Sequence, residues 1–308
     1  MRAAAVDVGT NSIKVCVGEK TSSGEIHILK ESYANIRLGE GISSGNELQP
    51  ESVNRAIGAI AEQVNLAREY DVDAIRMVGT SAVREASNSS LLIDRVLQET
   101  GIRLEPISEH DEARLSYYGV ALDPVLGDYQ GKQLVVDVGG GSTEFIYGQE
   151  KRMGFTVSVR VGIVRLTERF LKGDRQTLCQ LVDAGAMADK LLQGVSRKAR
   201  VDRIVGVGGS VINLARIREG IPIEETHRVH GMCLTYKDLR QTIDILITRT
   251  VEERRKIVGL ESERADTIIA GAVILDRILA LFEQEKLTVS VKGLRYGLLY
   301  EMLSANSY

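Results

Sequence analysis

The sequence has few cysteines and no long uninterrupted apolar segment. Its three cysteines, Cys16, Cys179 and Cys233, are widely separated and form no CxxC pair. A disulfide framework or a cysteine-based zinc site is therefore not expected, and reduced thiols are typical of cytoplasmic proteins. The longest apolar stretch, IIAGAVILDRILALF, is interrupted by Asp276 and Arg277 and is shorter than the roughly 20 residues of a membrane span. We expect a cytoplasmic protein with no membrane partner, and the N-terminal MRAAAVDVG predicts a strand rather than a signal peptide.

Two signatures of nucleotide binding are also missing. The sequence contains neither the GxxxxGK[ST] pattern of a P-loop nor the GxGxxG pattern of a Rossmann site, so neither type of site is expected. The formal net charge of −3 argues against a nucleic-acid partner, because nucleic-acid-binding domains are usually basic. An anionic small substrate remains compatible, since a cleft can be locally positive on an acidic protein.

The sequence contains a duplicated strand–turn–strand segment. Residues 5–18 read AVDVGTNSIKVCVG and residues 135–148 read VVDVGGGSTEFIYG, so a shift of 130 positions aligns Asp7 with Asp137. Each copy has an apolar strand, a turn of small polar residues and a second, alternating strand, which together predict a β-hairpin with a polar tip. A period of this length indicates a duplicated domain rather than a solenoid.

The polar tip of each hairpin is suited to binding an anion. Its backbone N–H groups can form a concave nest for phosphate oxygens, and glycine lets the anion approach the backbone closely. Asp7 and Asp137 end the first strand of each copy and can bind a cation that bridges the phosphates. A single copy would be an ordinary glycine turn, but two matched copies that both keep the aspartate favour phosphate binding.

Strand and helix patterns alternate along the chain and predict an α/β fold with two similar lobes and a cleft between them. The segment DPVLGDYQGKQ carries turn residues and marks the domain boundary. We expect an N-terminal lobe at 1–122 and a C-terminal lobe at 123–308. A helix is expected over 262–285, and a last helix, from about 294, that could pack back on the first lobe.

Two further segments are candidates for contacting an anion. Arg84, in GTSAVREASNSS, follows a strand end and can clamp a phosphate through two hydrogen bonds; the alternative is an ion pair with Glu85 or a neighbouring acid. The segment GVGGS, which includes Gly208, Gly209 and Ser210, follows a strand and opens a helix. The N-terminus of a helix attracts anions.

Acidic residues in two places are candidates for metal binding or catalysis. Glu144, in the second hairpin, could face the same cation as Asp137, unless it is a solvated strand acid. Glu109, Asp111 and Glu112 lie at the start of a predicted helix, where acids are common because of the helix dipole. One of the three could instead be a general base that orients water for attack on phosphorus. The residues alone do not choose among them.

The repeat and the order of several further motifs resemble the Ppx/GppA family of exopolyphosphatases and guanosine pentaphosphate phosphohydrolases over nearly the whole chain. The resemblance implies the fold of the actin-like ATPase and acetate and sugar kinase superfamily (ribonuclease H-like), in its short two-domain form. The matching segments are VDVGTNSIKV, IRLGEGISSGNELQPESV, VGTSAVREASN, ISEHDEARLSYYGV, VVDVGGGSTEF, GIVRLTERF, GVGGSVINLA, RVHGMCLT, ERADTIIAGAVIL and GLRYGLLYEM.

The resemblance also implies an activity. It implies release of terminal phosphate from inorganic polyphosphate or from pppGpp, with Mg²⁺, or alternatively Mn²⁺, as cofactor, by an enzyme that is commonly a homodimer. It makes Glu112 the base that activates water, Arg84 a contact of the attacked phosphate, and Asp137 and Glu144 metal ligands. Asp7, the partner of Asp137 in the repeat, is a further candidate ligand. The implied phosphate-binding residues are Gly9, Thr10, Asn11, Ser12, Gly139, Gly140, Gly141, Ser142 and Thr143.

Two positions depart from the family pattern. Glu109 stands where glycine is usual, and Tyr296 stands where glutamate is common. An added negative charge beside a polyanion would weaken binding, unless it faces away or helps to hold the metal. Other classes of function are a kinase that transfers phosphate from ATP, recognised by a phosphorylated acceptor, and a non-catalytic sensor of nucleotide or polyphosphate.

Overall fold

The structure, a computed structural model, describes residues 1–40, 46–195 and 200–304. Residues 41–45, which belong to one of the segments that match the family, lie outside this description. Among the described residues, no helix is both long enough and apolar enough to cross a membrane.

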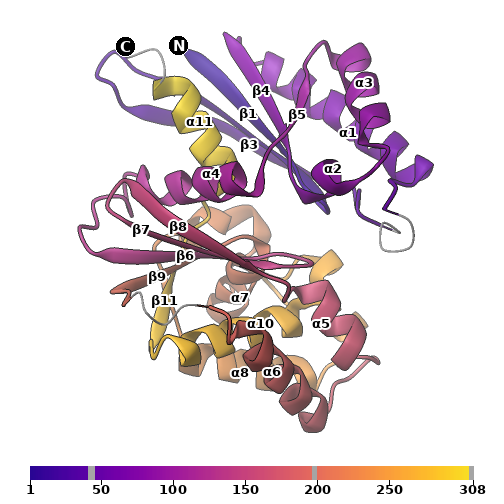
Figure 1. Ribbon diagram of the computed structural model, residues 1–308, viewed down its shortest axis with the longest axis vertical. Helices are drawn as coiled ribbons and strands as arrows, with labels where there is room; N and C mark the ends of the chain where they lie inside the picture. Colours follow the sequence, from indigo (N-terminus) through magenta and orange to yellow (C-terminus); the bar gives the residue numbers. More distant parts are fainter. Residues whose placement is uncertain (41–45, 196–199, 305–308) are drawn as a thin grey trace. The chain divides into compact units, whose positions relative to one another are not determined.

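The chain forms two compact units. The first comprises Met1–Leu122 and the segment that starts at Leu294, and the second comprises Asp123–Gly293. Each contains one mixed β-sheet with helices packed against it (Figure 1). The predicted α/β fold with two similar lobes is confirmed.

The first unit is built on a sheet with the strand order β3-β2-β1-β4-β5. The strand β2 pairs antiparallel with both β1 and β3, whereas β4 and β5 extend the sheet in parallel with β1. Its strands are β1 (Arg2–Val8), β2 (Ser12–Lys20), β3 (Ile26–Asn35), β4 (Ala74–Gly79) and β5 (Leu104–Pro106). Its helices are α1 (Pro50–Arg68), α2 (Ser81–Glu85), α3 (Ser89–Thr100), α4 (Glu109–Ala121) and α11 (Leu294–Ser304).

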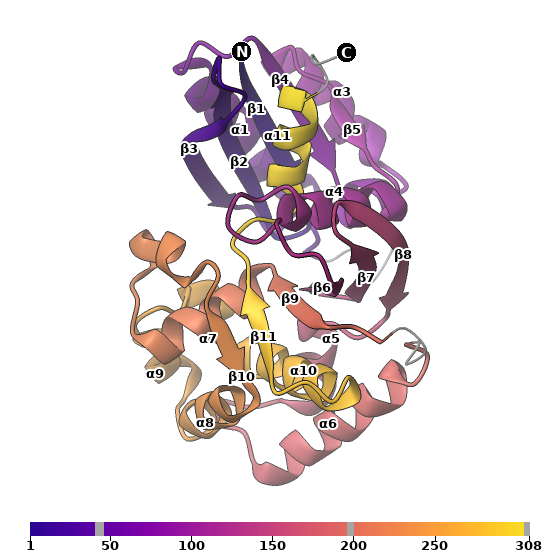
Figure 2. The same cartoon turned by 90° about the vertical axis from the view of Figure 1, so that its left-hand side faces the viewer.

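Both faces of this sheet are buried, as β1 illustrates. Ala4, Val6 and Val8 join one core together with residues of α1 and α3, whereas Ala3 and Ala5 join a second core with residues of α4 and α11. Successive side chains of a strand point to opposite faces, so an unbroken apolar strand suits burial on both sides. Figure 2 shows α11 lying across one face of this sheet.

The second unit repeats this order, with the strands arranged β8-β7-β6-β9-β11-β10. The hairpin β6–β7 and the edge strand β8 correspond to β1, β2 and β3, and β9 is parallel to β6 as β4 is to β1. Its strands are β6 (Lys132–Val138), β7 (Thr143–Gln149), β8 (Arg152–Val159), β9 (Arg203–Val207), β10 (Cys233–Thr235) and β11 (Lys286–Val289). Its helices are α5 (Ile163–Phe170), α6 (Leu178–Leu192), α7 (Gly209–Glu219), η2 (Ile223–Val229), α8 (Tyr236–Ile247), α9 (Val251–Arg254), η3 (Ser262–Arg264) and α10 (Ile268–Leu281).

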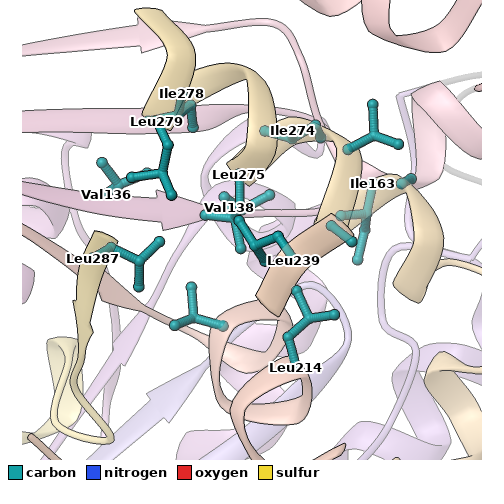
Figure 3. Packing of buried hydrophobic residues seen from close by; sticks show 14 of the residues in the cluster. Val136, Val138, Ile163, Leu214, Leu239, Ile274, Leu275, Ile278, Leu279 and Leu287 are labelled. Atoms are coloured by element: carbon teal, nitrogen blue, oxygen red, sulfur yellow. The ribbon is translucent and has the colours of Figure 1, made fainter. Parts of the chain in front are cut away.

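The helix α10 lies in the core of the second unit and is apolar almost all round. Figure 3 shows Ile274, Leu275 and Leu279 of this helix in one cluster with Val138 of β6 and Leu239 of α8. Burying each such side chain contributes about 1.5–3 kcal/mol. The apolar core therefore holds the carboxyl end of β6 firmly, next to the tip of the second hairpin.

The helix predicted over 262–285 is wrong at both ends. The chain forms the short 3-10 helix η3 first, and α10 runs only over Ile268–Leu281. At the break, the backbone N–H and the side chain of Arg264 both donate hydrogen bonds to Glu261. The hydrogen bonds of Arg264 stay within this polar turn, so α10 begins only at Ile268, where the apolar residues begin.

Candidate active site

In the first unit, the candidate residues gather at one edge of the sheet. The strands β1, β4 and β5 are parallel neighbours, so their carboxyl ends lie at the same edge. Asp7 is near the end of β1, Arg84 lies on α2 after β4, and Glu112 lies on α4 after β5. The topology thus brings together an acid, an arginine and a second acid that are far apart in the sequence.

The tip of the first hairpin is fixed by hydrogen bonds of its own backbone. The N–H of Gly9 donates to the carbonyl of Ser12 at 3.0 Å, and the carbonyl of Asn11 accepts from the N–H groups of residues 36 and 37. The carbonyl of Thr10 accepts from the N–H of Gly39, and its hydroxyl lies 2.9 Å from that of Ser81 on α2. These bonds hold the tip in place beside α2.

The tip of the second hairpin has the same closing bond, from the N–H of Gly139 to the carbonyl of Ser142 at 2.9 Å. The carbonyls of Gly139 and Gly140 accept from the first turn of α5. Within the part of the chain that the structure describes, the N–H groups of Gly140 and Gly141 donate to no backbone carbonyl. A tip whose carbonyls are engaged and whose donors are available suits an anion.

The hydroxyl groups of the second tip are engaged inside the unit. Ser142 donates to Glu144 at 2.6 Å, and the buried Thr143 donates to the carbonyl of Val161 at 2.6 Å. Ser158 also donates to Glu144, at 3.1 Å. The hydroxyls therefore orient the Glu144 carboxylate and the hairpin, while the backbone N–H groups are the donors suited to phosphate.

The two hairpins differ in charge at the cross-strand pair that contains the aspartate. In the first, Asp7 lies opposite Lys14; in the second, Asp137 lies opposite Glu144. Residues directly opposite on antiparallel strands share a face, with Cβ atoms about 5 Å apart, and like charges there repel each other. The second hairpin therefore carries two facing carboxylates whose repulsion a cation would relieve, whereas the first carries side chains of opposite charge.

Asp7 is nearly buried, and among the described residues its Oδ1 has no hydrogen-bond partner. Burial raises the pKa of Asp7, while the charges of Lys14 and Arg295 oppose the rise. An orphaned carboxylate oxygen in this position fits a cation or a water bound to one.

The structure gives different surroundings to the three acids at the start of α4. Ser108 is the N-cap, and Asp111 is bound to it, because the N–H of Asp111 donates to the Ser108 hydroxyl and that hydroxyl donates to the Asp111 carboxylate. The hydrogen bond from Ser108 lowers the pKa of Asp111. Asp111 therefore has the capping role that was one of the alternatives for these acids.

Glu112 instead contacts Arg84. The Nη1 atom of Arg84 donates to Glu112 Oε2 at 2.8 Å and to the carbonyl of Ile107 at 3.1 Å. Both side chains are largely buried, with 22% of Arg84 and 27% of Glu112 exposed. A guanidinium at this distance stabilises the ionised carboxylate, which is the form that can accept a proton.

The glycines that open α7 leave room for neighbouring charged groups. A Cβ on Gly208, whose φ is +85°, would lie 2.5 Å from Asp137 Oδ1. A Cβ on Gly209 would lie 2.1 Å from a guanidinium nitrogen of Arg264. The next residue, Ser210, is buried, and its hydroxyl lies 3.5 Å from the carbonyl of Val138. Because Gly208 and Gly209 have no side chain, Asp137 and Arg264 can lie close to the backbone of this loop. Ser210 instead faces β6.

Two arginines beside these loops escaped the sequence analysis. Arg264 covers Gly209 and is held by Glu261 at 2.7 Å. The Nε atom of Arg165 on α5 lies 3.6 Å from the position of a Cβ on Gly141. Their place in the matching segments ERADTIIAGAVIL and GIVRLTERF was the only available signal, because neither lies near a glycine loop in the sequence.

The residues of the second hairpin fit a magnesium ion only together with other oxygen ligands. Among the described residues, no three His, Cys, Asp or Glu side chains form a group that could hold a metal. Mg²⁺ usually keeps several waters and binds one or two carboxylates plus substrate phosphates. The facing carboxylates Asp137 and Glu144 match that donor set.

A family model described as the Ppx/GppA phosphatase family matches residues 16–306. The chain belongs to this family. The resemblance drawn from its motifs is therefore confirmed.

Named relatives of this Ppx/GppA chain include two kinds of hydrolase. Exopolyphosphatase 2 of Mycobacterium tuberculosis is 28% identical, over 96% of this chain and 97% of its own. The guanosine-5'-triphosphate,3'-diphosphate pyrophosphatase of Photobacterium profundum is 29% identical, over 98% of this chain and 59% of its own. A bifunctional 3-dehydroquinate synthase/phosphatase of Fusobacterium nucleatum is 27% identical, over 97% of this chain and 46% of its own. The chain thus spans less than two thirds of the last two relatives, and the names support the expected phosphoanhydride hydrolase.

Solved structures of the Ppx/GppA family share the fold. The crystal structure of the Aquifex aeolicus family member is 32% identical, with a TM-score of 0.88 over 100% of this chain and 99% of that one. An exopolyphosphatase from Cytophaga hutchinsonii is 29% identical, with a TM-score of 0.87 over 99% of this chain and 98% of that one.

Proposed function

We propose that this member of the Ppx/GppA family is an exopolyphosphatase, which hydrolyses the terminal phosphoanhydride bond of inorganic polyphosphate. The observation that carries the proposal is the hydrogen bond between Arg84 and Glu112. It sets a proton acceptor beside a group that binds phosphate, which is what attack by water on a terminal phosphate requires.

The glycine tips and Arg84 bind the polyanion in this proposal. Among the described residues, the N–H groups of Gly140 and Gly141 donate to no backbone carbonyl, and the first tip closes with the same backbone bond as the second. Holding the phosphate group in one orientation supplies much of the rate increase in phosphoryl transfer.

Glu112 acts as the general base. Its carboxylate takes a proton from water as the water oxygen bonds to the terminal phosphorus. The bond from that phosphorus to the bridging oxygen breaks, so that orthophosphate and a chain shorter by one phosphate are released. Arg84 first holds the Glu112 carboxylate and then contacts the phosphate oxygens.

Asp137 and Glu144 would hold a magnesium ion, with Mn²⁺ as an alternative and Asp7 as a further ligand. The bound ion would supply positive charge that offsets the charge of the phosphates. The carboxylate pair across β6 and β7 supports the assignment of Asp137 and Glu144.

Hydrolysis of the 5′ phosphate of pppGpp is the second candidate. The relative from Photobacterium profundum is named for a guanosine-5'-triphosphate,3'-diphosphate pyrophosphatase. Both reactions break a terminal phosphoanhydride bond, so the same base and loops would serve either substrate.

The test is orthophosphate release from polyphosphate and, in parallel, from pppGpp, with magnesium and then with EDTA. Glu112→Gln should lower kcat about 10²–10⁴-fold, while the charge-matched variant of the exposed Glu99 on α3, Glu99→Gln, keeps the native rate. Thermal melting confirms that both variants are folded.

Release from pppGpp alone would move the assignment to the second candidate. Full activity of Glu112→Gln would show that another group is the base. Unchanged activity in EDTA would remove the metal from the proposal.

A further inference from the structure

Arg84 lies among three carboxylates of its own unit. Its Nη1 atom donates to Glu112 at 2.8 Å, and its Nη2 atom lies 3.8 Å from Glu85 Oε1 and 3.9 Å from Glu109 Oε1. One guanidinium therefore faces three negative charges before any ligand is bound. A phosphate that binds to Arg84 therefore enters a region where these four side chains already carry a net negative charge.

Glu109 is the most exposed of these three acids. Glu112 is largely buried, and Glu85 follows Arg84 directly on α2. Glu109 comes from the first turn of a different helix, α4, and its side chain is 72% exposed. The N-cap bonds of α4 are made by Ser108 and Asp111, so the Glu109 carboxylate is not needed for them.

We propose that Glu109 is a specificity-determining residue that competes with phosphate for Arg84. The proposal rests on the proposed function of this site and explains what the extra acid does there. To engage Arg84, an anionic substrate must displace the Glu109 carboxylate and then remain close to it. The resulting repulsion grows with the charge of the substrate and is screened by salt. Glu109 thus weakens the binding of highly charged chains more than that of weakly charged ones.

The primary experiment measures binding without catalysis. Calorimetric titration of inorganic tripolyphosphate in EDTA at low salt compares the native protein with Glu109→Gln and with the control Glu99→Gln. Removing the exposed carboxylate of Glu109 from its pair with Arg84 should tighten Kd about two- to fivefold. The gain should vanish at about 1 M salt, where the Debye length is only ~3 Å. The control should bind like the native protein.

A second set of variants tests whether the effect runs through Arg84. In an Arg84→Gln background, Glu109→Gln should change Kd by less than it does in the native background, because the pair no longer exists. Glu109→Gly serves as a second variant that also removes the carboxylate. A native Kd in both Glu109 variants, weaker binding, or equal tightening by Glu99→Gln would overturn the proposal.

The competing idea is that Glu109 helps to hold a metal. In that case Glu109→Gln would raise KM when magnesium is present, which would also overturn the proposal. Failure of the proposed function gives a different result: tripolyphosphate would bind without any orthophosphate release, or would not bind to the native protein at all.

Discussion

At the scale of single residues, the cross-strand pair that contains the aspartate gives the two hairpins different charges. Both tips close with one N–H to carbonyl bond. Lys14 faces Asp7 in the first hairpin, and Glu144 faces Asp137 in the second. In the first hairpin, the positive charge of Lys14 thus offsets the charge of Asp7. In the second, two negative charges face each other, and a cation can offset them.

This difference in charge predicts that two charge-removing substitutions have opposite effects on the stability of the metal-free protein. Glu144→Gln should raise stability by about 0.2–1 kcal/mol, because like charges directly opposite repel each other. Lys14→Gln should lower it, because the charge of Lys14 opposes the effect of burial on Asp7. Thermal melting in EDTA measures both effects.

Adding magnesium provides a control for these two variants. It should raise the Tm of the native protein and have a smaller effect on Glu144→Gln, while Lys14→Gln keeps the response. If both variants shifted Tm in the same direction in EDTA, the difference between the hairpins would not be electrostatic.

At the scale of elements, the packing of α11 against α4 positions the proposed base. A Cβ on Gly297 of α11 would lie 1.9 Å from the carbonyl oxygen of Leu115 on α4, so the two backbones are in direct contact. Glu301 of α11 accepts hydrogen bonds from Arg114 at 2.5 Å and from Arg76 at 2.8 Å. The helix that carries Glu112 is therefore held by a segment from the end of the chain.

Gly297→Ala should destabilise the first unit by about 1–3 kcal/mol, because the added methyl group overlaps a backbone atom that cannot move away. The matched control is Gly58→Ala on α1, where a Cβ would meet nothing within 4 Å. That change should stabilise the helix by about 0.5–1 kcal/mol. Urea unfolding gives both values, and equal effects of the two changes would contradict the close contact.

At the scale of the whole chain, the polypeptide leaves the first unit after Leu122 and returns to it at Leu294. Both ends of the second unit meet in one buried cluster. The carboxylate of Asp123 forms an ion pair with Lys292, and its Oδ1 lies 3.1 Å from His230 Nε2. The backbone N–H groups of residues 125 and 126 also donate to it. The cluster ties the first and the last residues of this unit to each other.

This cluster predicts acid sensitivity. Burial by itself would raise the pKa of Asp123, but the bonds from His230 and Lys292 and the charge of Lys292 lower it well below its usual range. A lowered folded pKa stabilises the fold at pH values above the unfolded pKa of about 3.9, and this contribution is lost as the pH falls toward the folded pKa. Melting at about pH 3 and at about pH 6 should show the loss.

Asp123→Asn should remove that part of the pH dependence and cost roughly 3–5 kcal/mol at neutral pH, because Lys292 loses the partner of a buried pair. The exposed Asp128 provides the control, and Asp128→Asn should melt like the native protein. The same acid sensitivity in Asp123→Asn and the native protein would place its origin elsewhere.

Much of the fold follows from local patterns. The duplicated hairpin, the helix opened by Glu109 and the strand before Gly208 all lie where periodicity and turn residues predict them. The helix boundary near Arg264 was missed because a side-chain contact with Glu261 sets it. Arg165 was missed because its place beside Gly141 depends on how α5 packs on the hairpin tip.

The sequence by itself determined that two hairpins with acidic strand ends and glycine tips would form, because short-range pattern and backbone preference decide such elements. Only the tertiary structure decided the roles of the acids at the start of α4. Asp111 caps the helix and Glu112 reaches Arg84, 28 residues away in the sequence. The reason is physical: which side chains meet depends on the alignment of the parallel strands β4 and β5, which no local pattern contains.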